Sequence, residues 1–257
     1  MIGLSLRSLI GMFRRPTRHI LGLLAITLAS HGFADKPILT FGYIEFAPFY
    51  HTYPDGQGRG PFIDMARELG AAIGYDIKPV SLPPKRAVKL VGSGEVDFWF
   101  GLATNELYND NVYISKEPID HLELRAYSTK PMGTFSGRDD LAGKSIVIIR
   151  GYSYGGLRDF IYDPKNEIYA VQVSSMEQAL KVLDVRELDY VLGYTRPVSK
   201  ALQKYPLPEI DSRIISSLDI HMTLHKDVEN AKQLMEGLEK FQLNNFPPVK
   251  ISSQPDN

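Results

Sequence analysis

Hydrophobic and polar positions follow two periods along the chain, and these periods predict strands and helices in regular succession. Apolar positions that alternate, or run together for a few residues, predict strands, whereas apolar positions three and four apart predict helices. The predicted strands of the first half are 38–44, 76–82 and 95–102, and the predicted helices are 62–75 and 85–94. Strands that alternate with helices in this way indicate a parallel sheet with helices packed on it.

The same succession begins again after a polar, irregular stretch from Asn105 to Pro118. The predicted strands are 144–150, 167–173 and 188–194, and the predicted helices begin at Ser153 or cover 175–185 and 196–205. The segment "SMEQ" matches a helix capping box, with Ser175 or Ser174 as the cap. Two extended stretches, 121–130 and 216–226, flank this second unit, and a last helix is predicted over 227–243.

This order predicts an α/β fold with two lobes joined by two extended hinge crossings. We expect lobe 1 to be discontinuous, with residues 35–124 and 222–250, and lobe 2 to hold residues 125–221. Residues 251–257 are expected to be a frayed tail. Hinges of this kind allow two lobes to close on a ligand. The alternative is a single doubly wound sheet without a cleft.

Residues 1–34 have the pattern of a secretory signal peptide. Four arginines precede an apolar run from Ile20 to Leu28, and small residues then offer a cleavage point after Ala34. The run is about half of the roughly 20 residues that span a bilayer, so a retained anchor is the alternative. Met12 offers a second start. The sequence therefore predicts an exported, periplasmic protein.

Composition then excludes several classes of function. Removing the leader removes four arginines and no acidic residue, so the formal net charge falls from −1 to −5, which argues against nucleic-acid binding. The absence of cysteine excludes disulfides, thiolate metal sites and a lipid-anchored lipoprotein. His221 and His225 are four residues apart in a segment predicted to be extended, where they would not converge on a metal. We expect a monomer without metal or cofactor.

The glycine-rich segment "RGYSYGG" follows a predicted buried strand and leads into a helix. Unpaired backbone N–H groups at such a turn favour an anion or another polar oxygen. Neither nucleotide-binding fingerprint fits the spacing of its glycines. We expect Gly151, Ser153 and Tyr154 to contact a ligand. The alternative is that Ser153 is a helix cap and Tyr154 a surface aromatic residue.

Several motifs, taken in order, resemble the bacterial extracellular solute-binding proteins of family 3, the periplasmic amino-acid-binding type. They are "GYIEFAPFY", "GPFIDMARELGAAIGY", "LVGSGEVDFWFGLAT", "LAGKSIVIIRGYSYGG" and "VRELDYVLGY". The resemblance extends from about Ile38 to Leu243 and implies a type II, clamshell fold. It also implies a protein that closes on a small polar solute and delivers it to an inner-membrane ABC-type permease.

The residues that would hold an α-amino acid differ from those of the family. An arginine that usually binds the ligand carboxylate corresponds to Tyr108, and an aspartate that usually binds its ammonium group corresponds to Tyr194. A phenol cannot replace the two parallel charged hydrogen bonds of a guanidinium group. Asp110 and Arg125 lie close enough in sequence for a small shift of alignment to matter. We expect a ligand other than a standard α-amino acid bound in the usual way.

The remaining candidate ligand contacts are Glu45, Phe49, Arg86, Trp99 and Thr104. Phe49 and Trp99 suit an aromatic wall, Glu45 could receive a cation, and Arg86 could replace the missing carboxylate partner. For Glu45 the alternative is a solvated carboxylate, and for Arg86 it is an ion pair with Glu95 or Asp97. Two other functions stay open: a sensory protein that reports to a membrane receptor, and a cyclohexadienyl-dehydratase-like enzyme.

Overall fold

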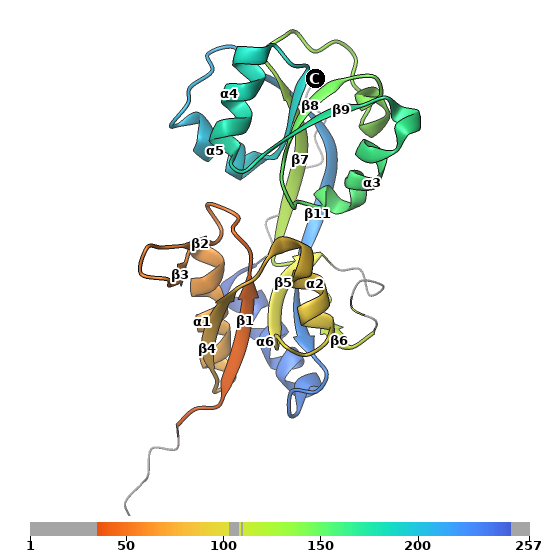
Figure 1. Cartoon of the computed structure of the whole chain (residues 1–257). Helices are drawn as coiled ribbons and strands as arrows, with labels where there is room; N and C mark the ends of the chain where they lie inside the picture. Colours follow the sequence, from red (N-terminus) through yellow and green to blue (C-terminus); the bar gives the residue numbers. More distant parts are fainter. Residues whose placement is uncertain (1–34, 103–107, 109, 248–257) are drawn as a thin grey trace, which may run out of the picture. The chain divides into compact units, whose positions relative to one another are not determined.

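The computed structural model describes residues 35–102, 108 and 110–247 (Figure 1). The described residues from Lys36 onward belong to one compact unit. The predicted signal peptide, Thr104 and the predicted tail at 251–257 lie outside the described residues. No helix in the described part of the chain is long and apolar enough to cross a bilayer.

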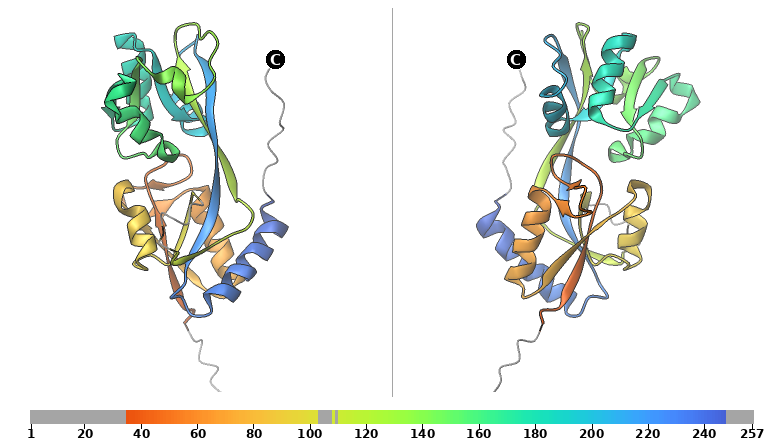
Figure 2. Two further views of the ribbon diagram at one scale, coloured as in Figure 1. Left: turned by 90° about the vertical axis from the view of Figure 1, so that its right-hand side faces the viewer. Right: turned by 60° about the vertical axis from the view of Figure 1, so that its left-hand side comes forward.

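Lobe 1 is built on a parallel sheet, as the strand–helix order predicts. Its strands are β1 (Ile38–Tyr43), β4 (Asp76–Ser81) and β5 (Phe98–Leu102), and its helices are α1 (Pro61–Ala72), α2 (Pro84–Gly92) and α6 (Ala231–Asn245). β1 pairs in parallel with both β4 and β5. In the two views of Figure 2, α1 and α6 lie together on one side of this sheet and α2 lies on the other. A short hairpin, β2 (His51–Thr52) with β3 (Gly58–Arg59), follows β1.

Lobe 2 repeats the arrangement on a smaller scale. Its strands are β8 (Ser145–Ile149), β9 (Tyr169–Val173) and β10 (Tyr190–Tyr194), and its helices are α3 (Leu157–Tyr162), α4 (Met176–Arg186) and α5 (Thr195–Leu202). β8 pairs in parallel with both β9 and β10. The predicted capping box is confirmed at α4, where the Ser175 side chain accepts a hydrogen bond of 3.2 Å from Gln178 N. Single-turn 3-10 segments lie at Arg138–Leu141, Tyr154–Gly156 and Pro164–Asn166.

Two long antiparallel strands, β7 (Asp120–Ser128) and β11 (Asp211–His225), run through both lobes (Figure 1). They pair with each other from Asp211 opposite Ser128 to Ile220 opposite Asp120. β11 then continues into lobe 1 and pairs with β5, while β7 pairs with β10 of lobe 2. The sheet is formally continuous in the order β4-β1-β5-β11-β7-β10-β8-β9, yet the architecture is two-lobed because one strand pair joins its halves. The predicted lobe boundaries fall within β7 and β11 and stay a prediction.

Sequence pattern and structure differ in two places along this strand pair. β6 (Val112–Ile114) lies in the stretch expected to be irregular and pairs with the end of β11. β11 begins at Asp211, five residues before its expected start. Pairing with β7 holds these first residues in a strand, whereas their sequence does not show the apolar pattern of a strand. A shift of register at Ile214–Ser216 marks a bulge there.

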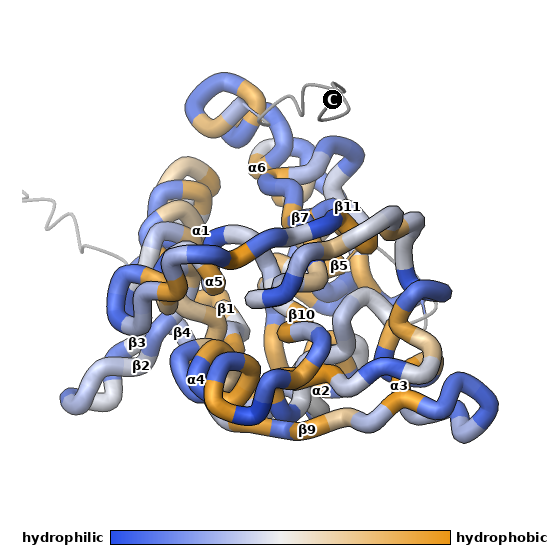
Figure 3. Tube along the Cα trace, turned by 90° about the horizontal axis from the view of Figure 1, so that it is seen from above, coloured by the Kyte–Doolittle hydropathy of each residue, from blue (hydrophilic) through white to orange (hydrophobic). Residues whose placement is uncertain are grey.

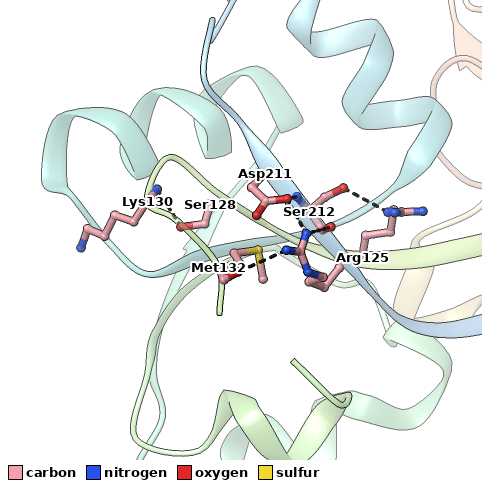
Figure 4. Close-up of polar contacts among 7 residues, drawn as sticks. Arg125, Ser128, Lys130, Met132, Asp211 and Ser212 are labelled. Atoms are coloured by element: carbon pink, nitrogen blue, oxygen red, sulfur yellow. Dashed lines mark hydrogen bonds and ion pairs between the residues drawn. The ribbon is translucent and has the colours of Figure 1, made fainter. Parts of the chain in front are cut away.

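Polar contacts tie β7 to β11 in lobe 2 (Figure 4). The Arg125 Nε donates a hydrogen bond of 3.2 Å to Ser212 Oγ across the two strands. Arg213 reaches from β11 to the Met132 carbonyl, with a distance of 3.2 Å, and forms an ion pair with Asp211. Partial burial raises the pKa of Asp211, but bonds from Arg213 and Ser212 outweigh it and hold this pKa below its usual range.

The apolar side chains are gathered between helices and sheet. α1, α4 and α6 alternate between hydrophobic and hydrophilic segments in Figure 3, as helices with one buried face do. One core cluster extends from Phe41 in lobe 1 through Leu124 on β7 to Leu192 in lobe 2. The lobes therefore share apolar packing along the two crossing strands.

Each lobe has the same acid–hydroxyl brace between neighbouring strands. In lobe 1, Asp97 accepts bonds of 2.7 and 2.6 Å from Thr40 N and Oγ1, and its N–H donates back to Thr40 Oγ1 at 3.0 Å. In lobe 2, Asp189 accepts bonds of 2.8 and 2.7 Å from Ser145 N and Oγ, and its N–H donates back at 3.0 Å. The aspartates that end "EVD" and "RELD", Asp97 and Asp189, are therefore strand-entry braces.

The brace of lobe 2 predicts a pH-dependent stability. Partial burial raises the pKa of Asp189, but the two bonds from Ser145, helped by Lys130 and Lys144, outweigh it and lower this pKa. We expect Asp189→Ala to reduce the free energy of unfolding by about 1–3 kcal/mol at neutral pH. A lowered native pKa stabilises the fold above the unfolded pKa, so the difference from wild type should shrink as the pH falls through the native value.

Urea unfolding of both proteins from pH 7 to acid pH measures this difference. Asp76→Ala is the matched control, because Asp76 is an exposed strand residue. A loss for Asp189→Ala no larger than that for Asp76→Ala, or independent of pH, contradicts the role given to Asp189.

Candidate ligand-binding site

A cavity of about 220 Å³ is lined by residues of both lobes. Lobe 1 contributes β5 and α2, and lobe 2 contributes the turn after β8 and the end of β10. The lining residues are Ile44, Phe46, Tyr50, Phe62, Pro84, Ala87, Val88, Trp99, Phe100, Gly101, Leu102, Tyr108, Leu122, Gly151, Tyr152, Ser153, Tyr194 and Ile220. No charged residue is among these described lining residues, so the described part of the wall is mostly aromatic and aliphatic, and neutral.

Four consecutive residues of β5, 99–102, line the cavity, and Trp99 with Gly101 forms one face of this strand there. They lie two residues apart and so face the same side of the strand. The indole covers Gly101 so closely that a Cβ there would lie 1.8 Å from Trp99 Nε1. Glycine at position 101 is therefore what lets the indole lie flat on the strand. The Trp99 side chain is buried, and its Nε1 has no hydrogen-bond partner among the described residues.

Tyr108 closes the same side of the cavity. Its hydroxyl donates a hydrogen bond of 3.3 Å to the Leu102 carbonyl. Burial raises the pKa of Tyr108 to about 12, against a smaller opposing effect of a weak hydrogen-bonding contact with the Trp99 side chain. The phenol is therefore neutral at physiological pH. It offers no charge to a ligand carboxylate, in agreement with the expectation drawn from its position in the sequence.

The glycine-rich turn after β8 brings lobe 2 to the cavity. Gly151 has a left-handed φ of +89°, and a Cβ there would lie 3.5 Å from Pro84 Cβ at the start of α2. Tyr152 crosses to lobe 1, where its hydroxyl donates a hydrogen bond of 3.2 Å to the Glu45 carbonyl. This turn is therefore a contact point between the lobes.

Aromatic rings of the two lobes meet at this contact. The ring of Phe46 lies edge-to-face against Tyr152 and Tyr194, with centroid separations of 5.5 and 5.3 Å. Burial raises the pKa of both tyrosines well above their usual value, so they too stay neutral. Edge-to-face packing of this kind adds about 0.5–1.5 kcal/mol per pair to the burial of the rings.

Five of the predicted site residues line the cavity: Trp99, Tyr108, Gly151, Ser153 and Tyr194. Four others, Glu45, Phe49, Arg86 and Tyr154, are outside its lining. Thr104 lies outside the described residues. The roles of these residues in binding stay predictions, and the structure gives only their places.

The side chain of Glu45 is turned away and contacts the β2 hairpin. It accepts hydrogen bonds from Thr52 N at 3.0 Å and from the Thr52 hydroxyl, and lies 3.2 Å from His51 Nδ1. Arg86 is exposed on α2. Neither alternative partner is paired with it: Asp97 braces Thr40, and Glu95 accepts a bond of 3.2 Å from Ser93.

Phe49 and Tyr154 lie one layer behind the cavity wall. Phe49 is buried and stacks on Phe46, with a centroid separation of 5.3 Å. Tyr154 stacks on Tyr194 at 6.0 Å, and its hydroxyl accepts a bond of 2.6 Å from Ile149 N. The alternative that made Tyr154 a surface aromatic residue is therefore wrong. Ser153 precedes the 3-10 turn but makes no side-chain capping bond.

Sequence reasoning missed Tyr152 and the α2 wall of Ala87 and Val88. Tyr152 lies inside the glycine-rich segment that attracted attention, but a turn has no period from which to read a side chain's direction. The α2 positions are apolar at helical spacing, and that pattern also describes an ordinary core face. Only the packing of lobe 2 close to α2 makes this face a cavity wall and not an ordinary core face.

An ion pair lies beside the cavity at the start of β7. The Arg196 guanidinium group, on α5, binds the buried Asp120 carboxylate with both nitrogens, one at 3.0 Å. Its Cζ also lies 5.0 Å from the ring centroid of Phe49 in lobe 1. A pocket of about 180 Å³ that includes both charged groups shares Leu122 and Tyr194 with the cavity. Arg196 thus links α5 to β7 and to the first lobe.

Among the described residues, neither a second depression nor a metal-ligand cluster adds a candidate site that joins the two lobes. An open depression of about 550 Å³ lies in lobe 2 and includes Arg138, Asp139 and Asp159. It is lined from lobe 2 and β11 alone. Within residues 35–102 and 110–247, no group of three or more potential ligands could hold a metal ion.

Solved structures share the fold. No protein-family model matches the chain, and no curated protein matches its sequence. An ancestral arginine-binding protein bound to arginine has a TM-score of 0.63 and 17% identity, covering 82% of this chain and 95% of that one. A histidine kinase sensor domain with similarity to periplasmic binding proteins has a TM-score of 0.63 and 16% identity, covering 82% and 91%.

The substrate-binding protein of an amino acid ABC transporter has a TM-score of 0.57 and 16% identity, covering 80% of this chain and 93% of that one. At these identities the likeness shows the fold alone. The chain has the two-lobed α/β fold of periplasmic binding proteins.

The Arg196–Asp120 pair gives a testable prediction. Arg196→Ala leaves the Asp120 carboxylate buried without its partner, and we expect a loss of about 1–3 kcal/mol in the free energy of unfolding, since Arg196 itself is half exposed. Arg186→Ala, on the exposed end of α4, is the control and should cost less than about 0.5 kcal/mol.

Denaturant unfolding of both variants, together with Asp120→Asn and the double variant, measures the coupling. The double variant should recover part of the loss because it leaves no unpaired charge. Strict additivity, or equal losses for Arg196→Ala and Arg186→Ala, contradicts the role of Arg196 as a link.

Proposed function

We propose that this protein is a solute-binding protein whose two lobes close on a small polar molecule. The observation that carries the proposal is the cavity, because Trp99 of lobe 1 and Tyr152 of lobe 2 both line it. A ligand placed there touches both lobes at once. It therefore binds more tightly to the closed arrangement and shifts the population toward it.

The ligand, in this proposal, is not a standard α-amino acid held by a guanidinium and a carboxylate. The two positions that would supply this charged clamp in the resembled family are Tyr108 and Tyr194, both buried and neutral. A zwitterion in the cavity would lose hydration at both charges without gaining ionic partners among the described lining residues. Hydrogen bonds rather than ion pairs supply its polar contacts.

We propose an exported protein whose partner is an inner-membrane permease or a membrane receptor. The leader-like pattern of residues 1–34 supports export. The structural neighbours include a substrate-binding protein of an ABC transporter and a histidine kinase sensor domain, so both kinds of partner are compatible with the fold. Capture of the closed protein by one partner separates transport from sensing.

No catalytic step is assigned. A dehydratase would need a protonated or paired carboxylate in the cavity. Glu45 lies outside the lining, and Glu177 pairs with Lys204 at 3.0 Å in lobe 2. The residue's own backbone N–H, and then the Lys204 side chain, lower the pKa of the Glu177 carboxyl. A general acid needs a raised pKa instead.

A thermal-shift screen with small-angle scattering tests the proposal. Amino acids, polyamines, organic acids and neutral ring compounds are added one at a time. A ligand at about 100 times its Kd should stabilise the protein by about 2.7 kcal/mol, which raises Tm by roughly 5–10 °C. The same ligand should reduce the radius of gyration, and standard α-amino acids should do neither.

A variant with Tyr152→Ala is the control for closure, since it removes the lobe-2 ring that crosses to Glu45. Its Tm should no longer respond to that ligand. If no compound of any class shifts Tm or the scattering curve, a solute-binding role is wrong.

A further inference from the structure

We infer that the cavity takes an uncharged, flat molecule with a single aromatic or heteroaromatic ring and a hydrogen-bond acceptor on its edge. This inference rests on the proposed function and specifies its ligand. Three observations carry it: the charge of the lining, the size and aromatic walls of the cavity, and an indole N–H without a partner.

The charge of the lining excludes an ionic ligand first. None of the described lining residues carries a charge, and Tyr50, Tyr108, Tyr152 and Tyr194 all have a raised pKa because burial disfavours the phenolate. Among these residues a carboxylate or phosphate would find no cation, and an ammonium group would find no anion. A buried charge without a partner is strongly disfavoured, so a neutral ligand is selected.

The nearest ion pair does not change this conclusion. Arg196 and Asp120 line the adjoining pocket but not the cavity, and they satisfy each other through two contacts. Each oxygen of the Asp120 carboxylate already accepts a hydrogen bond from Arg196, so the ammonium group of a zwitterion would compete with this guanidinium. The double contact holds the two charges away from the cavity.

Size and shape then limit the ligand to one ring. An engineered cavity of about 150 Å³ holds benzene, so the 220 Å³ here suits a ligand of about nine non-hydrogen atoms. Aromatic rings from both lobes, Trp99 on one side and Tyr152 with Tyr194 on the other, form its walls. A flat π system packs on such walls by offset stacking or edge-to-face contact.

The unpartnered donor gives the ligand its polarity. Trp99 Nε1 lies over Gly101, which is itself part of the lining, and makes no hydrogen bond of normal geometry in the described chain, although the neighbouring Tyr108 hydroxyl interacts with it weakly. Buried polar groups are rarely left unpaired, and an indole N–H can only donate. The N–H is buried against the strand, and a carbonyl or ring nitrogen on a ligand that displaces the indole slightly would satisfy it. Ser153 and the tyrosine hydroxyls offer further polar contacts.

The single tryptophan of the sequence makes the test specific to this site. Because Trp99 is the only tryptophan, its fluorescence reports on the cavity alone when tyrosine is not excited. The full mature chain is titrated with benzamide, benzoate, protonated benzylamine and phenyltrimethylammonium, which share one ring and differ in charge. L-phenylalanine adds a zwitterion with the same ring.

We expect benzamide to change Trp99 fluorescence and to bind at least about tenfold more tightly than each charged probe. In calorimetry, Trp99→Phe should weaken benzamide about 3- to 10-fold, because the ring is kept and the N–H is lost. Tyr152→Phe tests a hydroxyl on the opposite wall. Tyr162→Phe, the same change on an exposed tyrosine of α3, should leave the affinity unchanged.

Each other outcome overturns the inference. Preferred binding of phenyltrimethylammonium identifies an aromatic cage for a quaternary cation, and preferred binding of L-phenylalanine that is lost in Arg196→Ala identifies the ion pair as the true clamp. In both cases the solute-binding role stands and only the ligand class is wrong. No response to any ring probe also rejects the class, and the broad thermal-shift screen then decides whether the solute-binding role survives.

Discussion

The pairing of β7 with β11 is the constraint on which the rest of the structure depends. These two strands hold hydrogen bonds with each other from Asp120 to Ser128, and each then becomes part of the sheet of one lobe. No other strand pair of the described chain connects the two halves of the sheet. Bending or twisting of this one pair therefore moves whole lobes, while the cavity lies beside it, against Leu122 on β7 and Ile220 on β11.

The contact between the lobes is built from neutral rings. Phe46 meets Tyr152 and Tyr194, the Tyr152 hydroxyl reaches the Glu45 carbonyl, and Gly151 approaches Pro84. Such contacts are individually weak and are easily made and broken, as a reversible clamp requires. The charged groups that line the adjoining pocket are outside the cavity lining and are paired, Arg196 with Asp120 and Glu123 with Arg125. This separation explains why the cavity favours stacking and hydrogen bonds over the ionic clamp of amino-acid binders.

Much of the fold could be predicted from the sequence because strand and helix periods are strong in both lobes. β1, β4, β5, β8, β9 and β10 fall where apolar runs predict them, and the capping box at Ser175 forms as expected. β6 could not be predicted, since three residues carry too little pattern and depend on β11 for pairing. The early start of β11 could not be predicted for the same reason. Its first residues form a strand because they pair with β7, and they have no buried apolar face that a sequence pattern would show.

The site could be predicted only where a motif fixes direction. Trp99 lines the cavity, but so does its neighbour Phe100, so strand period alone does not separate cavity from core on β5; the turn motif brings in Gly151 and Ser153. The loop 46–50 has no period, so Phe49 could not be distinguished from Phe46, and Phe49 lies behind it against Phe62. Arg86 has the right chemistry and position in α2, but its exposure is a property of tertiary packing that its own segment does not encode.

The most direct measurement is the distance between the lobes by pulsed electron spin resonance. The sequence has no cysteine, so cysteines introduced at the exposed Glu68 of α1 and Lys181 of α4 carry the only two spin labels. The account predicts a broad distance distribution without ligand that becomes shorter and narrower with benzamide and stays unchanged with benzoate. A single distribution that is the same in all three samples would contradict two lobes that close on a neutral ligand.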